Sequence, residues 1–178
     1  IFVNRQVTND AEFVEDHEEY NRVVGLDFNL QTEDNKWTGK YYFHKSFSPE
    51  GGDQDLSSGG FLEYNSRDWK FNLGSTYVGD DFRADLGYTR REDIFTIDPV
   101  ATRVFYPKES IINTHTLELR GSSTWSPELD LLHTDAMLDL EYQIKFKNQN
   151  FIEVALNHRY TYLLEDFDPT GSEDGIPL

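Results

Sequence analysis

The feature that most constrains the fold is an alternation of apolar and polar residues that runs through long stretches of the chain. In LDLEYQIKFK, residues 138–147, every second residue from Leu138 is aliphatic or aromatic, and the residues between are charged or amides. The stretch FIEVALNHRYTY, residues 151–162, alternates in the same way after a short polar turn. Because successive side chains of a strand point to opposite faces, these stretches predict long, two-faced β-strands.

Comparable segments recur along the chain and predict an all-β fold of about nine antiparallel, up-and-down strands. They lie at residues 2–8, 21–31, 37–47, 59–65, 69–78, 82–91, 112–125, 138–147 and 151–162. No segment shows the apolar stripe of an amphipathic helix. Residues 92–110 contain Pro99 and Pro107 and do not alternate, so we expect an irregular connection there.

The last two segments also predict a register. If residues 148–150 form a three-residue loop with an asparagine in the left-handed conformation, the residues flanking this loop pair with each other. Lys145 then lies opposite Glu153, and Asp139 lies opposite Arg159, so opposite charges meet across the polar face. A slip by one residue would exchange the two faces, and the register is therefore well specified.

Composition excludes several classes of function. The formal net charge of −17 argues against a nucleic-acid partner, because phosphate binding requires clustered Lys and Arg. The absence of cysteine excludes disulfides, thiol catalysis and thiolate metal sites. No apolar run approaches the roughly 18–20 residues of a spanning helix. The chain opens with IFVNRQV, which already resembles a strand, so we interpret residues 1–178 as one segment of a longer protein.

Three features favour a transmembrane β-barrel over a soluble sheet. Several strands reach about ten residues, whereas strands of soluble proteins cluster near five or six. Tight turns near Asp34, Arg67 and Gln149 alternate with longer loops near Asp16, Gln54, Glu128 and Pro169. Aromatic residues mark strand ends, and the expected girdle comprises Trp37, Trp69, Tyr77, Phe82, Trp125 and Tyr162. Residues 92–110 are an exception, because the strand count places this long segment on the short-turn side.

The barrel interpretation assigns each face. The apolar face contacts lipid through Leu138, Leu140, Ile144, Phe146, Ile152, Val154 and Leu156. The polar face lines the lumen with Arg83, Asp85, Glu118, Arg120, Asp139, Glu141, Lys145, Glu153 and Arg159. Both charge signs occur there, which predicts a self-paired, partly plugged interior. Because nine is an odd number and bacterial barrels have even strand numbers, we expect further strands to complete the ring.

The sequence gives only weak support for catalytic or metal-binding residues. The five histidines are scattered without ligand spacing. Glu118 or Glu141 could act as a glycosidase acid only beside a cleft, for which the sequence gives no sign. The loop aspartates Asp53, Asp55, Asp80 and Asp81 could offer oxygen to calcium, but they lack the twelve-residue ligand pattern and are better explained as solvated turns. We therefore expect no catalytic residue, no metal site and no cofactor.

Several segments together resemble a known family. They are NRVVGLDFNL, HKSFSP, YVGDDFRADLGYTRRE, FYPKES and FDPTG followed by IPL. In their order they resemble a family of Bacteroidota-type bacteria that joins an N-terminal family-nine-like carbohydrate-binding domain to a C-terminal outer-membrane β-barrel region of unknown function. The resemblance runs over nearly the whole chain and places it inside the barrel region, for which no catalytic residues are established.

These observations predict a non-enzymatic part of a bacterial outer-membrane β-barrel. We expect it to anchor or scaffold a surface carbohydrate-associated protein, with a conduit for small solutes as a second role. Its partners would be the lipid bilayer and, at the longer loops, another outer-membrane protein or a glycan. One alternative is a soluble β-sandwich that binds glycans through Trp37, Tyr41 and Trp69 on one concave surface. The other is a β-rich glycoside hydrolase with two carboxylates facing each other across a groove.

Overall fold

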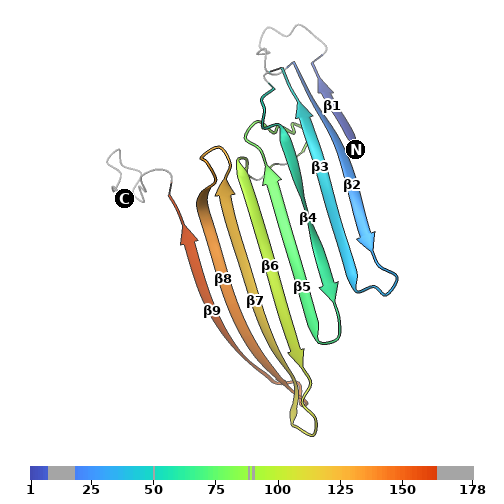
Figure 1. Ribbon diagram of the computed structural model, residues 1–178, viewed down its shortest axis with the longest axis vertical. Helices are drawn as coiled ribbons and strands as arrows, with labels where there is room; N and C mark the ends of the chain where they lie inside the picture. The colour runs from blue at the N-terminus through green and yellow to red at the C-terminus, as the bar shows by residue number, and fades with distance from the viewer. Residues whose placement is uncertain (8–18, 50, 88, 90, 164–178) are drawn as a thin grey trace.

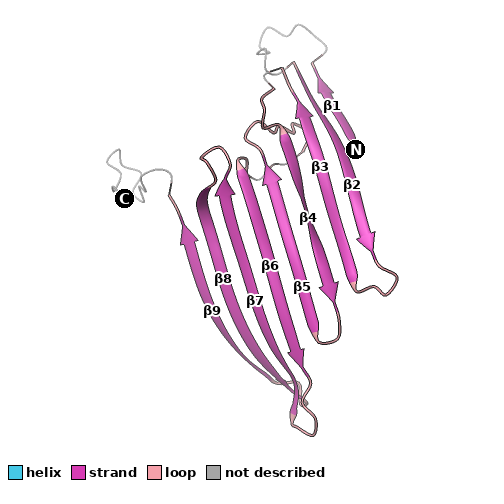
Figure 2. Ribbon diagram, in the orientation of Figure 1, coloured by secondary structure: helices cyan, strands magenta, loops and turns pink. Residues whose placement is uncertain are grey.

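A computed structural model describes residues 1–7, 19–49, 51–87, 89 and 91–163, and it shows one antiparallel sheet of nine strands (Figure 1). The strands are β1 Phe2–Gln6, β2 Tyr20–Gln31, β3 Trp37–Phe47, β4 Leu56–Asn65, β5 Trp69–Val78, β6 Ile94–Phe105, β7 Ile112–Ser126, β8 Leu132–Phe146 and β9 Phe151–Thr161. Each strand pairs with its neighbours in the sequence. The predicted all-β, up-and-down architecture is confirmed, and every regular element in the described ranges is a strand (Figure 2).

The sheet is long and open. Strands β2 to β9 each contain 10 to 15 residues. Strands β1 and β9 form the two edges and do not pair with each other within the described ranges (Figure 1). The described part of the chain contains no helix long and apolar enough to cross a membrane.

The connections of the sheet gather at two ends. The turns at residues 32–36, 66–68, 106–111 and 147–150 lie at one end, which we call the short-turn end (Figure 1). The connections at residues 48–55, 79–93 and 127–131 lie at the opposite end, the long-loop end. The last of these is shorter than expected, because β8 already begins at Leu132. The expected loops around Asp16 and Pro169 lie outside the described residues.

The sequence prediction was wrong for residues 82–91 and 92–110. The described residues between 82 and 91 form no strand, and β6 instead occupies Ile94–Phe105. The alternation of Phe82 and Ala84 reflects a different packing, since both residues belong to a small apolar cluster with Val23 and Val78. With β6 at Ile94–Phe105, the long connection before it lies at the long-loop end, and a short turn at residues 106–111 follows it. Short turns and long loops therefore alternate without the exception that the sequence suggested for residues 92–110.

Strand β6 contains a proline because its neighbour makes room for it. Pro99 pairs with Leu73 of β5, but the β6–β7 register passes from Ile97 to Val100 without pairing Asp98 or Pro99. On β7, a Cβ added to Gly121 would lie 3.3 Å from Cγ of Pro99. A proline cannot donate to the ladder, so it is tolerated where the ladder is interrupted and the facing residue has no side chain.

The β8–β9 hairpin differs from its predicted register by two residues. The observed pairs include Asp139–Asn157, Gln143–Glu153 and Lys145–Phe151, so neither predicted charge pair lies directly across the strands. The three-residue loop lies one residue earlier than expected, at residues 147–149, because the Phe146 N–H donates to the Asn150 carbonyl at 2.8 Å. Gln149 rather than an asparagine takes the left-handed conformation, with φ of 72°. A shift of two residues keeps each side chain on its predicted face, and Arg159 still reaches Asp139 diagonally at 3.7 Å.

The buried core is small and lies on the polar side of the sheet. Among the described residues, the only buried apolar side chains are Val23, Val78 and Phe82. The register places Val23 and Val78 on the same face as Asn21 and Ser57, and the loop at residues 79–93 supplies Phe82. The strands are therefore not held by an apolar core on their apolar face.

Candidate functional site

The first candidate site is the apolar surface formed by one face of the strands, which we call the outer face. Its residues include Leu26, Phe28, Tyr41, Phe43, Leu62, Leu73, Leu119, Leu138, Leu140, Val154 and Leu156, and each of these side chains is exposed. Leu26 and Leu156 are 75% and 65% accessible. All seven residues predicted to face lipid lie on the outer face. A soluble monomer rarely exposes a contiguous apolar patch larger than about a few hundred Å².

Aromatic side chains border the outer face at the short-turn end. The ring centroids of Trp37 and Tyr64 are 5.0 Å apart, and Trp69 stacks on Phe71 at 5.3 Å. The guanidinium carbon of Arg103 lies 4.7 Å from the ring centroid of Trp69. Such rings combine an apolar body with a polar tip or a cation partner, which suits a boundary between hydrocarbon and water.

A second aromatic row crosses the outer face at the long-loop end. Its ring pairs are Phe95–Trp125 at 5.7 Å, Trp125–His133 at 5.4 Å and His133–Tyr160 at 5.4 Å. Phe95 and Phe105 lie ten residues apart on the outer face of β6, which corresponds to about 33 Å along a strand. At the usual tilt of about 40°, this length spans about 25 Å, the height of the apolar band of an outer-membrane barrel.

The structure places four of the six predicted girdle residues in these two rows or directly beside them. Trp37 and Trp69 lie at the short-turn end, Trp125 lies at the long-loop end, and Tyr77 pairs with Phe95. The other two lie elsewhere. Phe82 is 5% accessible inside the apolar cluster, and Tyr162 lies just beyond the end of β9. Phe82 was misassigned because its segment was predicted to be a strand.

The opposite face, which we call the inner face, is polar. It carries seven of the predicted lumen residues, from Glu118 on β7 to Arg159 on β9. Glu118 and Glu141 are direct cross-strand partners, an arrangement of like charges that needs compensation. Arg120 Nη2 lies 2.5 Å from Glu118 Oε1, and Thr102 Oγ1 donates to the other carboxylate oxygen at 3.1 Å. The charges of the inner face are therefore partly self-paired.

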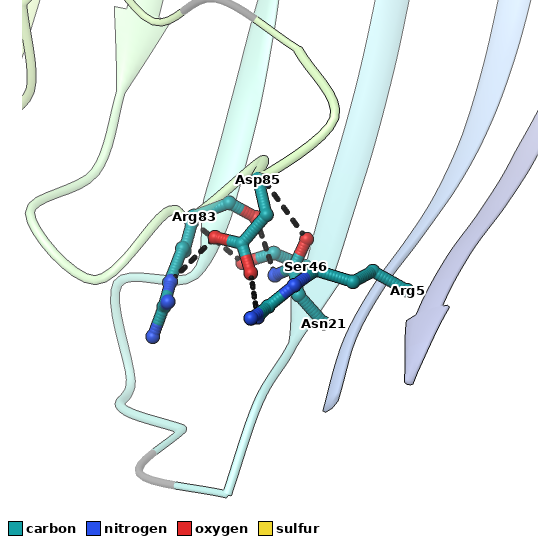
Figure 3. Close-up of polar contacts among 5 residues, drawn as sticks. All are labelled: Arg5, Asn21, Ser46, Arg83 and Asp85. Carbon is teal, nitrogen blue, oxygen red and sulfur yellow. Dashed lines mark hydrogen bonds and ion pairs between the residues drawn. The ribbon is translucent and has the colours of Figure 1, made fainter. Parts of the chain in front are cut away.

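The described part of the loop at residues 79–93, between β5 and β6, folds onto the inner face. Two buried side chains hold its backbone (Figure 3). The Asn21 amide donates to the Arg83 carbonyl at 2.8 Å and accepts from the Asp85 N–H at 3.1 Å. The Arg83 N–H donates to Ser46 Oγ at 3.1 Å. Asn21 and Ser46 are 2% and 1% accessible, so these bonds are shielded from water and each is worth more than an exposed one.

An ion cluster adds to this anchor. Asp85 Oδ2 lies 2.6 Å from Arg5 Nη1 of β1, and Asp85 Oδ1 lies 2.6 Å from Arg83 Nε of the same loop (Figure 3). Asp85 therefore links the first strand of the sheet to the loop that follows the fifth. Arg83 and Asp85 lie on the inner face, but they reach it from a loop and not from the strand that was predicted for residues 82–91.

A pocket of about 850 Å³ lies between this loop and the wall of the sheet. Its lining includes Val3 of β1, Asn21 of β2, Tyr42 of β3, Thr96 of β6 and Thr124 of β7. The residues that line this hollow come from strands β1 to β7 and from the loop between β5 and β6.

The sequence did not identify Asn21 and Ser46 as anchoring residues. Each occupies a polar position of an alternating strand and looks like an ordinary lumen residue. The usable signal was in the loop, where GDDFRADLG combines glycines, acids and one large aromatic. Such a mixture is more typical of a packed loop than of a strand.

The loop aspartates have partners within the protein. Asp55 accepts from Lys45 Nζ at 2.6 Å, and Asp81 accepts from the Gln54 N–H at 3.0 Å. In the described ranges, no three residues among His, Asp and Glu gather as metal ligands.

The two alternative interpretations, a glycan-binding β-sandwich and a glycoside hydrolase, require particular arrangements of aromatic residues and of carboxylates. Trp37, Tyr41 and Trp69 do share one accessible face, but they lie there among exposed leucines. Glu118 and Glu141 are neighbours on adjacent strands and do not face each other across a groove.

Comparisons with protein-family models, with curated proteins and with solved structures find no match to this chain. Function is therefore inferred from the two faces of the sheet and from the loop that folds onto one of them.

Proposed function

We propose that this chain forms part of the wall of a bacterial outer-membrane β-barrel. In this proposal the outer face contacts lipid, the inner face encloses a polar interior, and the barrel anchors or scaffolds a carbohydrate-associated protein at the cell surface. A conduit for small solutes through the interior is a second role of the same barrel.

The observation that carries the proposal is the location of the buried cluster. A soluble sheet of this size would pack its apolar face against a second layer and leave its charged face in water. Here the loop at residues 79–93 covers part of the charged face instead, and Phe82 of this loop is buried with Val23 and Val78 of the sheet. The apolar face carries no such cover from the described residues. Hydrocarbon is the environment that suits an exposed face of Leu, Phe and Val bordered by aromatic rows.

The strand directions support a larger ring. The strands alternate in direction, so β1 and β9 run the same way, and a direct β1–β9 pair would be parallel (Figure 1). Closure with antiparallel pairs alone needs an odd number of additional strands. Backbone groups at an open edge would be costly in lipid, so we include these additional strands in the proposal.

The anchoring role draws on the family resemblance of segments such as HKSFSP and FYPKES, which associates barrels of this kind with a carbohydrate-binding domain. The conduit role draws on the polar inner face. Because the loop occupies part of this interior, the proposed conduit is narrow and suited to small solutes.

Fractionation of the full protein in a bacterial host tests the membrane assignment. We expect the protein in the outer-membrane fraction, resistant to extraction by alkaline carbonate or urea and released by detergent. Recovery as a soluble monomer without detergent would reject the barrel and favour the β-sandwich alternative.

A further inference from the structure

The hollow beneath the β5–β6 loop has the size and fixed shape of a ligand site. Its volume of about 850 Å³ lies within the range of about 300–1,000 Å³ that is usual for small-molecule sites. The loop that roofs it is anchored by Asn21 and Ser46, which are almost inaccessible to water. A pocket held in this way exists before a ligand arrives, so little conformational entropy is lost on binding.

One side of the pocket presents a row of hydroxyl groups. The register pairs Tyr42 with Gly59, Gly59 with Thr76, Thr76 with Thr96, and Thr96 with Thr124, so these residues form one line across five strands. Thr96 and Thr124 share a hydrogen bond of 2.9 Å. Within the described part of the chain, the hydroxyls of Tyr42 and Thr76 have no hydrogen-bond partner, so both can donate to or accept from a ligand.

The other side of the pocket is apolar. Val23, Val78 and Phe82 form the buried cluster, and Ala84 and Leu86 of the loop also line the hollow. A ligand that fits both sides has one apolar surface and one surface of hydrogen-bonding groups.

The charges around the pocket further restrict the ligand. Acidic residues outnumber basic ones by 33 to 16 in the chain, yet no Asp or Glu of the described residues lines this pocket. Its one charged lining residue in those ranges is Arg91, whose guanidinium lies 2.8 Å from Asp135 Oδ2 and 3.4 Å from Thr134 Oγ1. A cation would find no carboxylate among the described lining residues, and burying an unpaired charge is costly.

We propose that this pocket is a binding site for small uncharged solutes with one apolar side, and that it excludes cations. The site rests on the proposed function, because it belongs to the barrel interior. This pocket would favour neutral solutes over cations at the point where the β5–β6 loop narrows the interior. The open part of the inner face, around Glu118 and Glu141, would still attract cations.

Single cysteines test this selectivity, because the chain has none of its own. The Thr76→Cys variant places a thiol in the pocket, and Gln143→Cys places one on the open inner face beside Glu153, which accepts from Gln143 at 2.9 Å. Both are reacted in the full protein in membranes with neutral methyl methanethiosulfonate and with a cationic trimethylammonium methanethiosulfonate. Rates are normalised to those of a free thiol. We expect Thr76→Cys to prefer the neutral reagent by about tenfold or more, and Gln143→Cys to show no such preference.

Equal rates with both reagents at Thr76→Cys, or no reaction with either, would overturn the proposal. Thr96→Cys, in the same hydroxyl row, serves as a second pocket position if the first variant does not assemble.

Saturable protection of Thr76→Cys by benzyl alcohol, without protection of Gln143→Cys, is the expected sign of binding. Protection of neither variant, or of both, would overturn the proposal. A third variant, Leu156→Cys on the outer face, reports on the barrel itself, since free labelling there by the cationic reagent would reject the lipid assignment separately.

Discussion

Asn21 connects a strand to a loop that lies far along the chain. Its amide satisfies the carbonyl of Arg83 and the N–H of Asp85 together. Truncation would leave both backbone groups buried without a partner, which costs about 1–3 kcal/mol for each group. Ser46 supports the same loop through the N–H of Arg83, so the two anchors act on one element.

We expect Asn21→Ala to release the loop locally. Amide hydrogen exchange of residues 82–87 should accelerate by about tenfold or more, because the loss exceeds about 1.4 kcal/mol. Asn29→Ala is the matched control, since Asn29 lies on the inner face of the same strand and is exposed. Unchanged exchange in Asn21→Ala would show that the loop is held by other contacts.

The turn between β2 and β3 contains a carboxylate with a strongly lowered pKa. Lys36 Nζ lies 2.9 Å from Asp34 Oδ2, and Thr32 Oγ1 donates to Asp34 Oδ1 at 2.8 Å. These side-chain hydrogen bonds, led by that of Lys36, lower the pKa of Asp34 from 3.8 to about 2. The folded state therefore favours the ionised form. The resulting stabilisation is present above the ordinary pKa and disappears as the pH falls through the lowered one.

Carboxyl chemical shifts followed by NMR between pH 1 and 6 should report this lowered pKa. Lys36→Met removes the main cause and should move the pKa of Asp34 back toward its ordinary value. Lys40→Met, on the inner face of β3, should leave it unchanged. A pKa of Asp34 that is ordinary in the parent protein would contradict the turn geometry.

At the level of elements, close approach between strands depends on particular glycines. A Cβ added to Gly60 of β4 would lie 2.0 Å from the Lys40 carbonyl oxygen and 2.7 Å from Cα of Tyr41, both of them backbone atoms of β3. A Cβ added to Gly74 of β5 would meet its nearest atom at 3.4 Å, an ordinary contact. The β3–β4 pair therefore has no room for a side chain at Gly60.

Gly60→Ala should lower the free energy of unfolding by about 1–3 kcal/mol, because the backbone of β3 must shift. Gly74→Ala should change it by less than about 1 kcal/mol. Urea titration of the refolded protein in lipid vesicles measures both. A similar loss of unfolding free energy in the two variants would mean that β3 and β4 can move apart at Gly60 at little cost.

The sequence predicted eight of the nine strands, most of them because their alternation of apolar and polar residues is long and uninterrupted. It failed at β6, where Pro99 interrupts the pattern and its accommodation depends on Gly121 of another strand. It also assigned Phe82 to a strand, because alternation does not distinguish a two-faced strand from a loop that buries every second residue. The residues of the inner face could be assigned from the sequence, because every second residue of a strand points to the same face. The anchoring role of Asn21 could not, because it depends on a loop distant in sequence.

For the whole molecule, the proposal assigns different environments to adjacent residues of one strand. Val154 and Ala155 are both exposed on β9, but they point to the outer and the inner face respectively. Val154→Arg should cost about 2–4 kcal/mol if the outer face contacts lipid near the bilayer centre. Ala155→Arg should cost little, since it lies in a polar interior opposite Glu141. Equal small costs, measured by urea unfolding in vesicles, would argue for water on both sides.

The most direct measurement of the central claim is site-directed spin labelling along β8 in membranes. Labels are placed singly at residues 138–141, which alternate between the two faces. If the outer face contacts hydrocarbon, Leu138 and Leu140 should show high accessibility to oxygen and low accessibility to a water-soluble nickel complex, with the reverse at Asp139 and Glu141. Labels at Leu138 and Leu140 that are immobile and inaccessible to both reagents would place that face in a protein core and contradict the proposal.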